Sequence, residues 1–279
     1  METMHLVIDL AKCVGCFNCM VACKDEHVGN SWLPYTDAQQ KHGQKWINPK
    51  KHERGAAPFT EMCFVTKLCQ HCGDAACEKA APGAVSRRSD GVVMLDADKA
   101  KGNKELVDAC PYGSISWNDE LKTAQKCTMC AHLLDNGWKE PRCVQACPLR
   151  ALSVVRCSDA EFEGIIKNQQ LEPLTDGGNA PRVMYRNLYK SNTCFVAGAL
   201  AYRDGEVERA AADATVRLIK DENTIGETKT DFFGEFKIDR LPINSGTYEL
   251  LCTLDGREPL RRDIIINETS PCLDVMMFD

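Results

Sequence analysis

Seventeen cysteines in 279 residues limit what this chain can fold into more than any other feature. Thirteen of them lie at or before Cys147, mostly in closely spaced groups, and the other four are single residues further along the chain. The first residues show no basic region followed by an apolar stretch, so we expect no signal peptide. In such a chain, dense Cys-x-x-Cys pairs indicate metal or cluster thiolates rather than disulfides.

The first cysteine motif runs from Cys13 to Cys23 with gaps of two, two and three residues, the spacing of bacterial ferredoxins. A tight loop can place three thiolates on one [4Fe-4S] cube, whereas the fourth points toward a second cluster. The partner motif that this requires runs from Cys127 to Cys147, with gaps of two, twelve and three residues, and Pro148 follows it. The exchange of fourth ligands predicts cluster one, with Cys13, Cys16, Cys19 and Cys147, and cluster two, with Cys23, Cys127, Cys130 and Cys143.

A second pair of motifs lies between these two, and four of its cysteines are missing. From Cys69 to Cys77 the gaps are two and four residues, but the next ligand position holds an alanine before a proline. The partner motif keeps only the cysteine that precedes Pro111. The same exchange of ligands leaves one complete set, cluster three, with Cys69, Cys72, Cys77 and Cys110. A fourth cluster has lost every ligand, since its positions hold Ala81, Ala100, Asn103 and Leu106.

Other interpretations of these residues have weaker support than cluster ligation. A structural zinc site also takes four cysteines, but a cysteine at every third position crowds a single tetrahedral ion. His71 and His132 lie inside ligand loops without occupying ligand positions, so we expect them behind the ligands or at the surface. Three lysines beside ligands either offset the clusters' negative charge or are solvated: Lys12, Lys24 and Lys126. The cysteines outside the three sets are expected to be structural thiols: Cys63, Cys157, Cys194, Cys252 and Cys272.

The overall composition is that of an ordinary globular protein, with 44% hydrophobic and 27% charged residues. No apolar run approaches the roughly 20 residues that span a bilayer, so we expect no transmembrane segment. A net charge of -6, with both signs spread along the chain, argues against a nucleic-acid partner. We expect the chain in the cytoplasm, or exported in folded form with a partner that carries a twin-arginine signal.

A change of composition near residue 160 predicts an α+β chain with two domains. Residues 1–160 are expected to form a bacterial-ferredoxin-like domain with three [4Fe-4S] clusters and strands at 5–8 and 92–95. Residues 161–194 are expected to be a linker with a short helix at 161–170. Its turn-forming stretch, 173–181, includes Asp176 and Gly177.

From Phe195 onward, apolar residues recur at every second position, which is the period of a half-buried strand. The alternating residues are Val216, Leu218, Phe236, Ile238, Tyr248, Leu250, Cys252, Leu254, Ile264, Ile266, Leu273, Val275 and Met277. Residues 195–279 are therefore predicted to be a small all-β sandwich or barrel. The segments 230–238 and 246–250 resemble transthyretin-like and Ig-like sandwich modules, and we find no catalytic constellation in them.

Four motifs in this order, an insertion in the last, and the segments CPYGSISW at 110–117 and KCTMCAH at 126–132 are specific features. Through these features, residues 1 to about 157 resemble the iron–sulfur subunits of the dimethyl-sulfoxide-reductase family. The resemblance implies an electron-transfer subunit in a heterodimer with a large molybdopterin-guanine-dinucleotide subunit, which binds molybdenum or tungsten and holds the active site. The missing cluster and the added sandwich narrow the resemblance to family members of the transhydroxylase type, which act on polyhydroxylated aromatics. The alternative is a reductive catechol dehydroxylase or another reductase of the family.

The resemblance also implies an order for the clusters. We expect a row of cluster one, cluster two, the missing site and cluster three, with a gap that slows electrons before cluster three. Such a gap suits a reaction without net electron demand. A different class of function is a free polyferredoxin whose sandwich serves adhesion or docking, although we favour a sandwich that enlarges the subunit interface.

Overall fold

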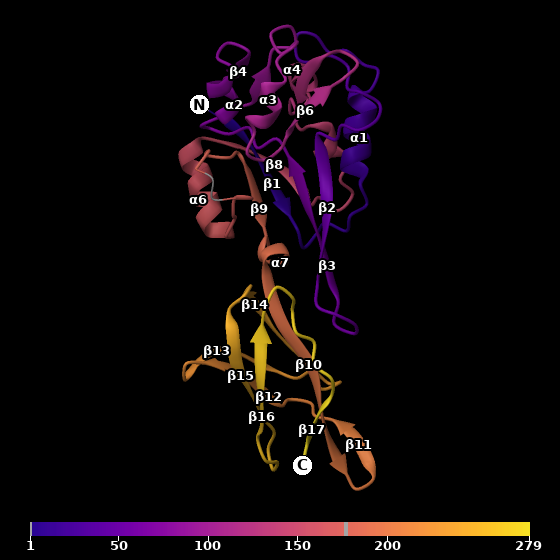
Figure 1. The fold of residues 1–279 in the computed structure, drawn as a ribbon, viewed down its shortest axis with the longest axis vertical. Helices are drawn as coiled ribbons and strands as arrows, with labels where there is room; N and C mark the ends of the chain where they lie inside the picture. The colour runs from indigo at the N-terminus through magenta and orange to yellow at the C-terminus, as the bar shows by residue number, and fades with distance from the viewer. Residues whose placement is uncertain (1, 176–177) are drawn as a thin grey trace. The chain divides into compact units, whose positions relative to one another are not determined.

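The computed structural model describes residues 2–175 and 178–279, so Asp176 and Gly177 of the predicted turn lie outside the described residues. The chain divides into two compact units (Figure 1). Unit 1 comprises Met1–Lys51 and Phe64–Leu188, and unit 2 comprises His52–Cys63 and Tyr189–Asp279. No helix in the described parts of the chain is long and apolar enough to cross a membrane.

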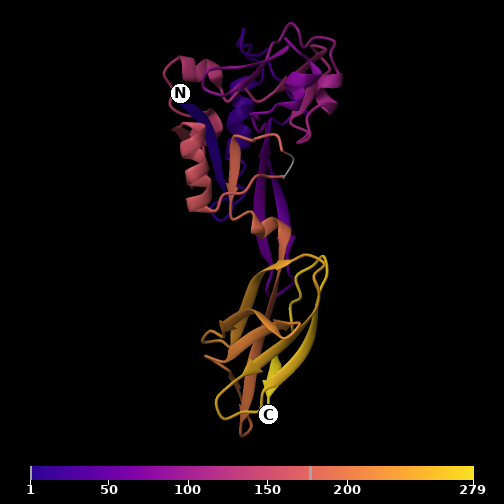
Figure 2. The ribbon, with the colours of Figure 1, turned by 90° about the vertical axis from the view of Figure 1, so that its left-hand side faces the viewer.

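A three-stranded sheet of order β8-β1-β9 organises unit 1. β1 (Thr3–Asp9) pairs antiparallel with β8 (Leu152–Cys157) and parallel with β9 (Val183–Arg186). Helix α6 (Asp159–Gln169) lies along this sheet (Figure 2). Its Phe162 packs with Val7 and Met184 in one apolar cluster. A capping box between Ser158 and Glu161 starts the helix, because each side chain satisfies a backbone N–H that has no partner within the helix.

The rest of unit 1 is built from short hairpins and helices that carry the cysteine motifs. The hairpins are β2 (Ile47–Arg54) with β3 (Glu61–Leu68), β4 (Val85–Arg87) with β5 (Val93–Leu95), and β6 (Ile115–Asn118) with β7 (Thr123–Lys126). The helices are α1 (Asn18–His27), α2 (Ala76–Ala80), α3 (Glu105–Asp108), α4 (Ala131–Asp135) and α5 (Arg142–Gln145).

The division of the chain differs from the expected linker at 161–194. Helix α6 and strand β9 belong to unit 1, because their apolar side chains complete its core. Unit 2 begins at α7 (Tyr189–Asn192), and β10 starts at Thr193. Unit 2 also includes 52–63, the tip of the β2–β3 hairpin. No apolar period marks this tip, so its place in unit 2 could not be predicted from the sequence.

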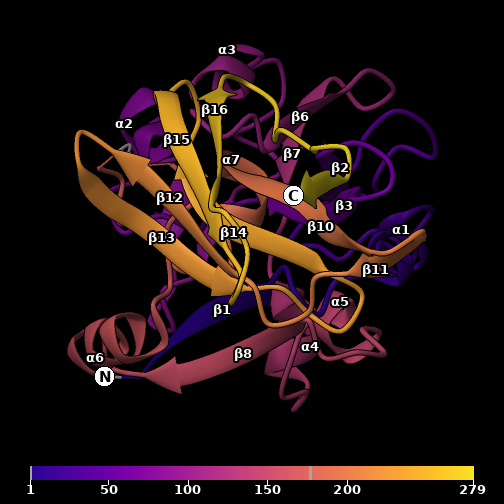
Figure 3. The ribbon, with the colours of Figure 1, turned by 90° about the horizontal axis from the view of Figure 1, so that it is seen from below.

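Two four-stranded sheets form unit 2. One has the order β11-β10-β14, with β17 parallel to β10, and the other has the order β13-β12-β15-β16, whose strands Figure 3 shows side by side. The strands are β10 (Thr193–Asp204), β11 (Val207–Ala210), β12 (Thr215–Lys220), β13 (Asn223–Lys229), β14 (Glu235–Pro242), β15 (Gly246–Thr253), β16 (Leu260–Ile266) and β17 (Met276–Phe278). The all-β character predicted for this part of the chain is confirmed.

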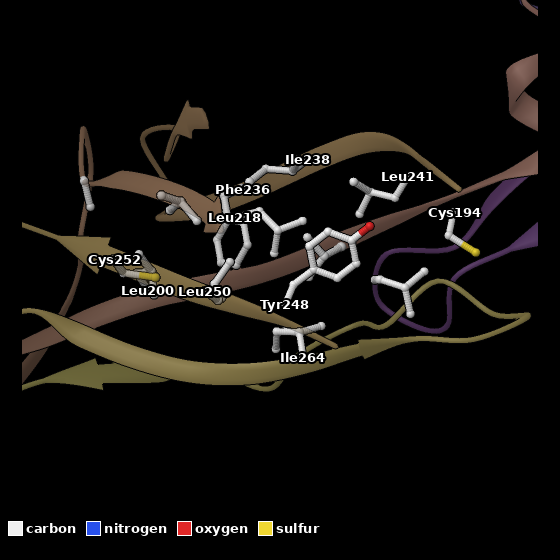
Figure 4. Close-up of a cluster of buried hydrophobic side chains, with 14 of the residues drawn as sticks. Cys194, Leu200, Leu218, Phe236, Ile238, Leu241, Tyr248, Leu250, Cys252 and Ile264 are labelled. Atoms are coloured by element: carbon white, nitrogen blue, oxygen red, sulfur yellow. The ribbon is translucent and has the colours of Figure 1, made fainter. Parts of the chain in front are cut away.

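The core of unit 2 lies between the two sheets (Figure 4). Both sheets contribute to it, for example through Phe236 on β14 and Leu250 on β15. The predicted alternation holds along β12, β14, β15 and β16, whose inward residues are buried. It fails near the C-terminus, where Val275 is 55% exposed and Phe278 is buried instead. The strand there is only three residues long, and its register with β10 decides which side chain enters the core.

Candidate iron–sulfur centres

The first cysteine loop leads directly into helix α1. Cys19 and Cys23 lie four residues apart on this helix, so both side chains lie on one face of it. The loop before them turns through Gly15, which has a φ of +68°. A Cβ atom at Gly15 would lie 2.3 Å from the ring of Phe64, so only glycine fits between the loop and β3.

The four thiols predicted for cluster one face one another. Burial first, and then the thiols of Cys13, Cys147 and Cys16, raise the pKa of Cys19 to about 12. The backbone N–H of Ala151 donates a hydrogen bond of 3.2 Å to Cys147 Sγ. The four cysteines line a cavity of about 330 Å³ together with Pro148, and Cys16 is exposed at its edge.

The thiols predicted for cluster two are the most deeply buried. Burial raises the pKa values of Cys23 and Cys143 well above the ordinary range, and Cys127 and Cys130 raise both further. The backbone N–H of Met129 donates a hydrogen bond of 3.3 Å to Cys127 Sγ. Positive φ angles of +52° at Met129 and Cys130 curl this loop, which directs backbone N–H groups toward sulfur.

The thiols predicted for cluster three also lie together. Burial, followed by the thiols of Cys69, Cys110 and Cys77, raises the pKa of Cys72 to about 12. The N–H of Ser114 donates a hydrogen bond of 3.4 Å to Cys110 Sγ. The four cysteines line a cavity of about 370 Å³.

Each set suits a cluster better than a single ion. Ligands of one zinc ion would all lie about 2.3 Å from a common point. Within 2–175 and 178–279, no group of three or more His, Cys, Asp or Glu side chains is arranged to hold one metal ion. Four gathered thiols that oppose one another's ionisation, and N–H groups that point at sulfur, match the thiolate ligands of a [4Fe-4S] cube.

Electrostatic interactions link the three sets in pairs. Cys19 of cluster one helps to raise the pKa of both Cys23 and Cys143 in cluster two. After burial, Cys69 of cluster three is the group that most raises the pKa of Cys127 in cluster two. Thiols of clusters two and three therefore interact electrostatically, whereas the expected position of the missing site between the two clusters stays a prediction. The motifs indicate which cysteines share a site, whereas packing of the two motif pairs decides which sites adjoin.

The site without ligands is an apolar core rather than an empty space. Ala81, Ala100 and Leu106 are 7%, 0% and 1% exposed and pack in one cluster with neighbours such as Val93 and Ile115. The thiols that pack against this cluster are Cys72, Cys77 and Cys110, all from cluster three. Among the described residues, no thiol of clusters one or two packs there. The ligand-free core therefore adjoins cluster three, and it also includes Ala124 of β7, the strand that leads to Cys127.

Comparisons with known proteins agree with this arrangement. A family model described as a 4Fe-4S dicluster domain matches residues 60–157. The pyrogallol hydroxytransferase small subunit of Pelobacter acidigallici is 40% identical to this chain, over 92% of the chain and 93% of the relative. One component of the anaerobic dimethyl sulfoxide reductase of Escherichia coli is 35% identical, over 52% of the chain and 69% of the relative. The chain belongs to the iron–sulfur subunits of the dimethyl-sulfoxide-reductase family.

Membership of this family makes the chain an iron–sulfur subunit that transfers electrons and binds [4Fe-4S] clusters. A further member, the arsenate respiratory reductase iron–sulfur subunit ArrB of a Shewanella species, is 29% identical over 69% of this chain and 99% of the relative. The similarity to the reductase subunits covers less of the chain than the similarity to the hydroxytransferase subunit.

Among the histidines and lysines near the ligands, His132 and Lys126 are buried, whereas Lys12 is exposed and Lys24 is half-buried. His132 stacks on Trp32 and lies 3.0 Å from Glu26 Oε1. Lys126, 2% exposed, donates hydrogen bonds to the carbonyls of Val93 at 2.5 Å and Cys127 at 3.0 Å. Lys126 also lines the cluster three cavity. Its ammonium group thus lies between the loops of clusters two and three, where it offsets negative charge.

One residue near cluster two was not identified from the sequence. His27, 1% exposed, places Nε2 3.9 Å from Cys130 Sγ, and its ring lies against those of Trp46 and His132. The only sequence signal was its position, four residues after Cys23 on α1. One further helical turn brings a side chain to the same face as the cysteine.

Proposed function

We propose that the chain binds three [4Fe-4S] clusters through the three cysteine sets defined above. The proposed ligands are Cys13, Cys16, Cys19 and Cys147 for cluster one, Cys23, Cys127, Cys130 and Cys143 for cluster two, and Cys69, Cys72, Cys77 and Cys110 for cluster three. The clusters supply one-electron chemistry when bound. The mutual effects of the thiols on one another's pKa support this sorting of ligands.

The chain acts as the electron-transfer subunit of a molybdenum- or tungsten-pterin enzyme, and the catalytic subunit docks at the cluster one end of the row. Cys16 is exposed there. Three exposed apolar side chains line the same cavity, Val14, Phe17 and Leu149. An apolar rim around an accessible ligand suits a permanent subunit contact, because association would bury the rim and exclude water from the path of the electron.

The partner's reaction is the transfer of hydroxyl groups between polyhydroxylated aromatics. The observation that carries this proposal is the 40% identity to the pyrogallol hydroxytransferase small subunit along nearly the whole chain. The ligand-free site supports it. An apolar core beside cluster three takes the place of a fourth cluster, so the chain has one relay site fewer, which suits a reaction without net electron demand.

A reductive catechol dehydroxylase, or another reductase of the family, is the second candidate. It is favoured by the similarity to the arsenate and dimethyl sulfoxide reductase subunits. The two candidates differ in one requirement. A reductase consumes electrons at every turnover and stops without an external reductant, whereas a transhydroxylase continues.

Metal analysis of the purified complex tests the proposal together with an assay on pyrogallol. We expect about twelve irons per heterodimer, one molybdenum or tungsten, and turnover of pyrogallol without an external reductant. About sixteen irons would contradict the ligand sets. Strict dependence on a reductant would favour the dehydroxylase or reductase. Isolation of the chain without a pterin subunit would favour a free polyferredoxin.

The sandwich of unit 2 is proposed to be an Ig-like or transthyretin-like module that enlarges the contact with the catalytic subunit. Its interior is packed by apolar side chains from both sheets, which leaves no room for a ligand between them. Protection of β10–β17 amides from hydrogen exchange in the complex, relative to the separated chain, would support this role. Equal exchange in both forms would oppose it.

A further inference from the structure

His71 lies between two proposed ligands of cluster three, Cys69 and Cys72. The residue has a φ of +45°, a left-handed conformation that few residues adopt without a constraint. Its side chain is 1% exposed, and the backbone N–H of Val93 donates a hydrogen bond of 3.1 Å to its Nδ1. The ring is therefore held in one orientation by β5.

This hydrogen bond decides where the ring carries its proton. Nδ1 accepts from an N–H group, so it has no proton of its own. An imidazole whose Nδ1 accepts a hydrogen bond cannot be the doubly protonated cation, so the ring is neutral. A neutral imidazole with a bare Nδ1 carries its proton on Nε2.

The Nε2–H group has no hydrogen-bond partner among the described residues. An unsatisfied buried donor costs about 1–3 kcal/mol, so a partner is expected. His71 lines the cavity of about 370 Å³ that the four thiols of cluster three surround. The hydroxyl of Tyr112, which lines the same cavity, is also buried without a partner. Two unused donors thus accompany four sulfur atoms around one cavity.

We propose that His71 Nε2–H donates a hydrogen bond to a sulfur atom of cluster three and raises its reduction potential, with the Tyr112 hydroxyl as a second donor. This inference rests on the ligand set proposed above. A hydrogen bond to sulfur favours the reduced cluster, because that form carries one more negative charge. The end of the row then retains an electron more readily than four thiolates alone would allow.

Replacement of His71 by asparagine separates the proposed donor from the structural contact. Asparagine tolerates a left-handed backbone, and its side-chain oxygen can still accept from the Val93 N–H, but it lacks a donor at the Nε2 position. The matched control is His42→Asn, because His42 is exposed and lies outside the three sets. Both variants are compared with the unchanged complex in redox titrations followed by electron paramagnetic resonance.

In His71→Asn, we expect reduction of cluster three to become about tenfold less favourable, which is about 59 mV for one electron. The potentials of clusters one and two should change less, and His42→Asn should change none. Tyr112→Phe should lower the potential of cluster three in the same direction. An unchanged potential of cluster three in His71→Asn, with all three clusters present, would overturn the inference.

If the His71→Asn variant fails to assemble, a measurement on the unchanged complex still tests the inference. With ¹⁵N-labelled histidine, reduced cluster three should show a nitrogen coupling and an exchangeable proton coupling in pulsed paramagnetic resonance. Absence of both couplings also overturns the inference. The iron content separates this failure from that of the proposed function. About eight irons in the unchanged complex would contradict the presence of cluster three. About twelve irons without the couplings would contradict only the proposed role of His71.

Discussion

Arg54, on the tip of the β2–β3 hairpin, donates hydrogen bonds to both carboxylate oxygens of Asp239 on β14, at 2.7 and 2.9 Å. The same guanidinium donates to Glu61 Oε2 at 2.8 Å, and its side chain is only 8% exposed. Lys237 joins this network through Glu61 Oε1 at 2.5 Å. The tip is thus tied to the sandwich of unit 2 by charged groups rather than by an apolar stripe.

Removal of the Arg54 guanidinium should loosen this attachment. In Arg54→Met, we expect a loss of about 3 kcal/mol in local stability, because two partly buried carboxylates lose their hydrogen bonds from Arg54 and keep only Lys237 as a shared partner. Hydrogen exchange of the β10 and β14 amides in the full chain measures the effect. The control is Arg217→Met, which removes an exposed pair with Glu227 and should cost less than about 1 kcal/mol. Equal effects of the two substitutions would contradict this account.

The same network makes the stability of unit 2 depend on pH. Burial raises the pKa values of Glu61 and Asp239, but hydrogen bonds from Lys237 and Arg54 outweigh it and leave both pKa values below normal. Their contribution is therefore complete above the unfolded values of about 4, and it is lost as the pH falls through the folded values. The stability difference between the unchanged chain and Arg54→Met should shrink from about pH 6 to about pH 3.5. Urea unfolding at each pH tests this, and a constant difference would oppose it.

Loss of a single ligand should remove one cluster and leave the others. In Cys72→Ala, we expect the iron content to fall from about twelve to about eight, while the signals of clusters one and two remain. Cys252→Ala is the matched control, because this thiol is 1% exposed in the sandwich core and belongs to no set. Iron analysis with paramagnetic resonance measures both. Loss of iron in the Cys252 variant would contradict the division into ligands and structural thiols.

Side chains that fill the ligand-free site should contribute to stability as core residues do. Leu106→Ala removes a side chain that is 1% exposed, so we expect a loss of about 3 kcal/mol. Leu121→Ala, at a position 40% exposed on unit 1, should cost far less. Denaturant unfolding of the full chain compares them. A negligible effect at Leu106 would mean that the site is loosely packed, contrary to the structure.

Adjacent sites should interact magnetically when reduced. The thiol of Cys69 in cluster three raises the pKa of Cys127 in cluster two. Because the two sites interact in this way, reduced clusters two and three should broaden each other's resonance signals. Cys72→Ala should sharpen the signal of cluster two by removing its neighbour. A cluster two signal that is the same with and without cluster three would favour the gap between these clusters that the sequence led us to expect.

Local rules were enough for much of this protein. Cysteine spacing predicted three sets of four ligands, because a cluster ligand loop constrains only a few consecutive residues. The members of each set lie together in the structure, and their role as cluster ligands stays a prediction. The period of two predicted the inward residues of β12, β14, β15 and β16, because side chains alternate along any strand. Helix α6 lies where the sequence predicted a short helix, at 161–170.

Features that depend on distant contacts required the tertiary structure. The place of 52–63 in unit 2 depends on the contact of Arg54 with Asp239, which lies 185 residues away. The electrostatic interaction between clusters two and three depends on Cys69 and Cys127, which belong to different motif pairs. The orientation of His71 depends on Val93, a residue of another strand. None of these contacts leaves a period or a spacing in the sequence, because each is made only when segments far apart in the chain pack together.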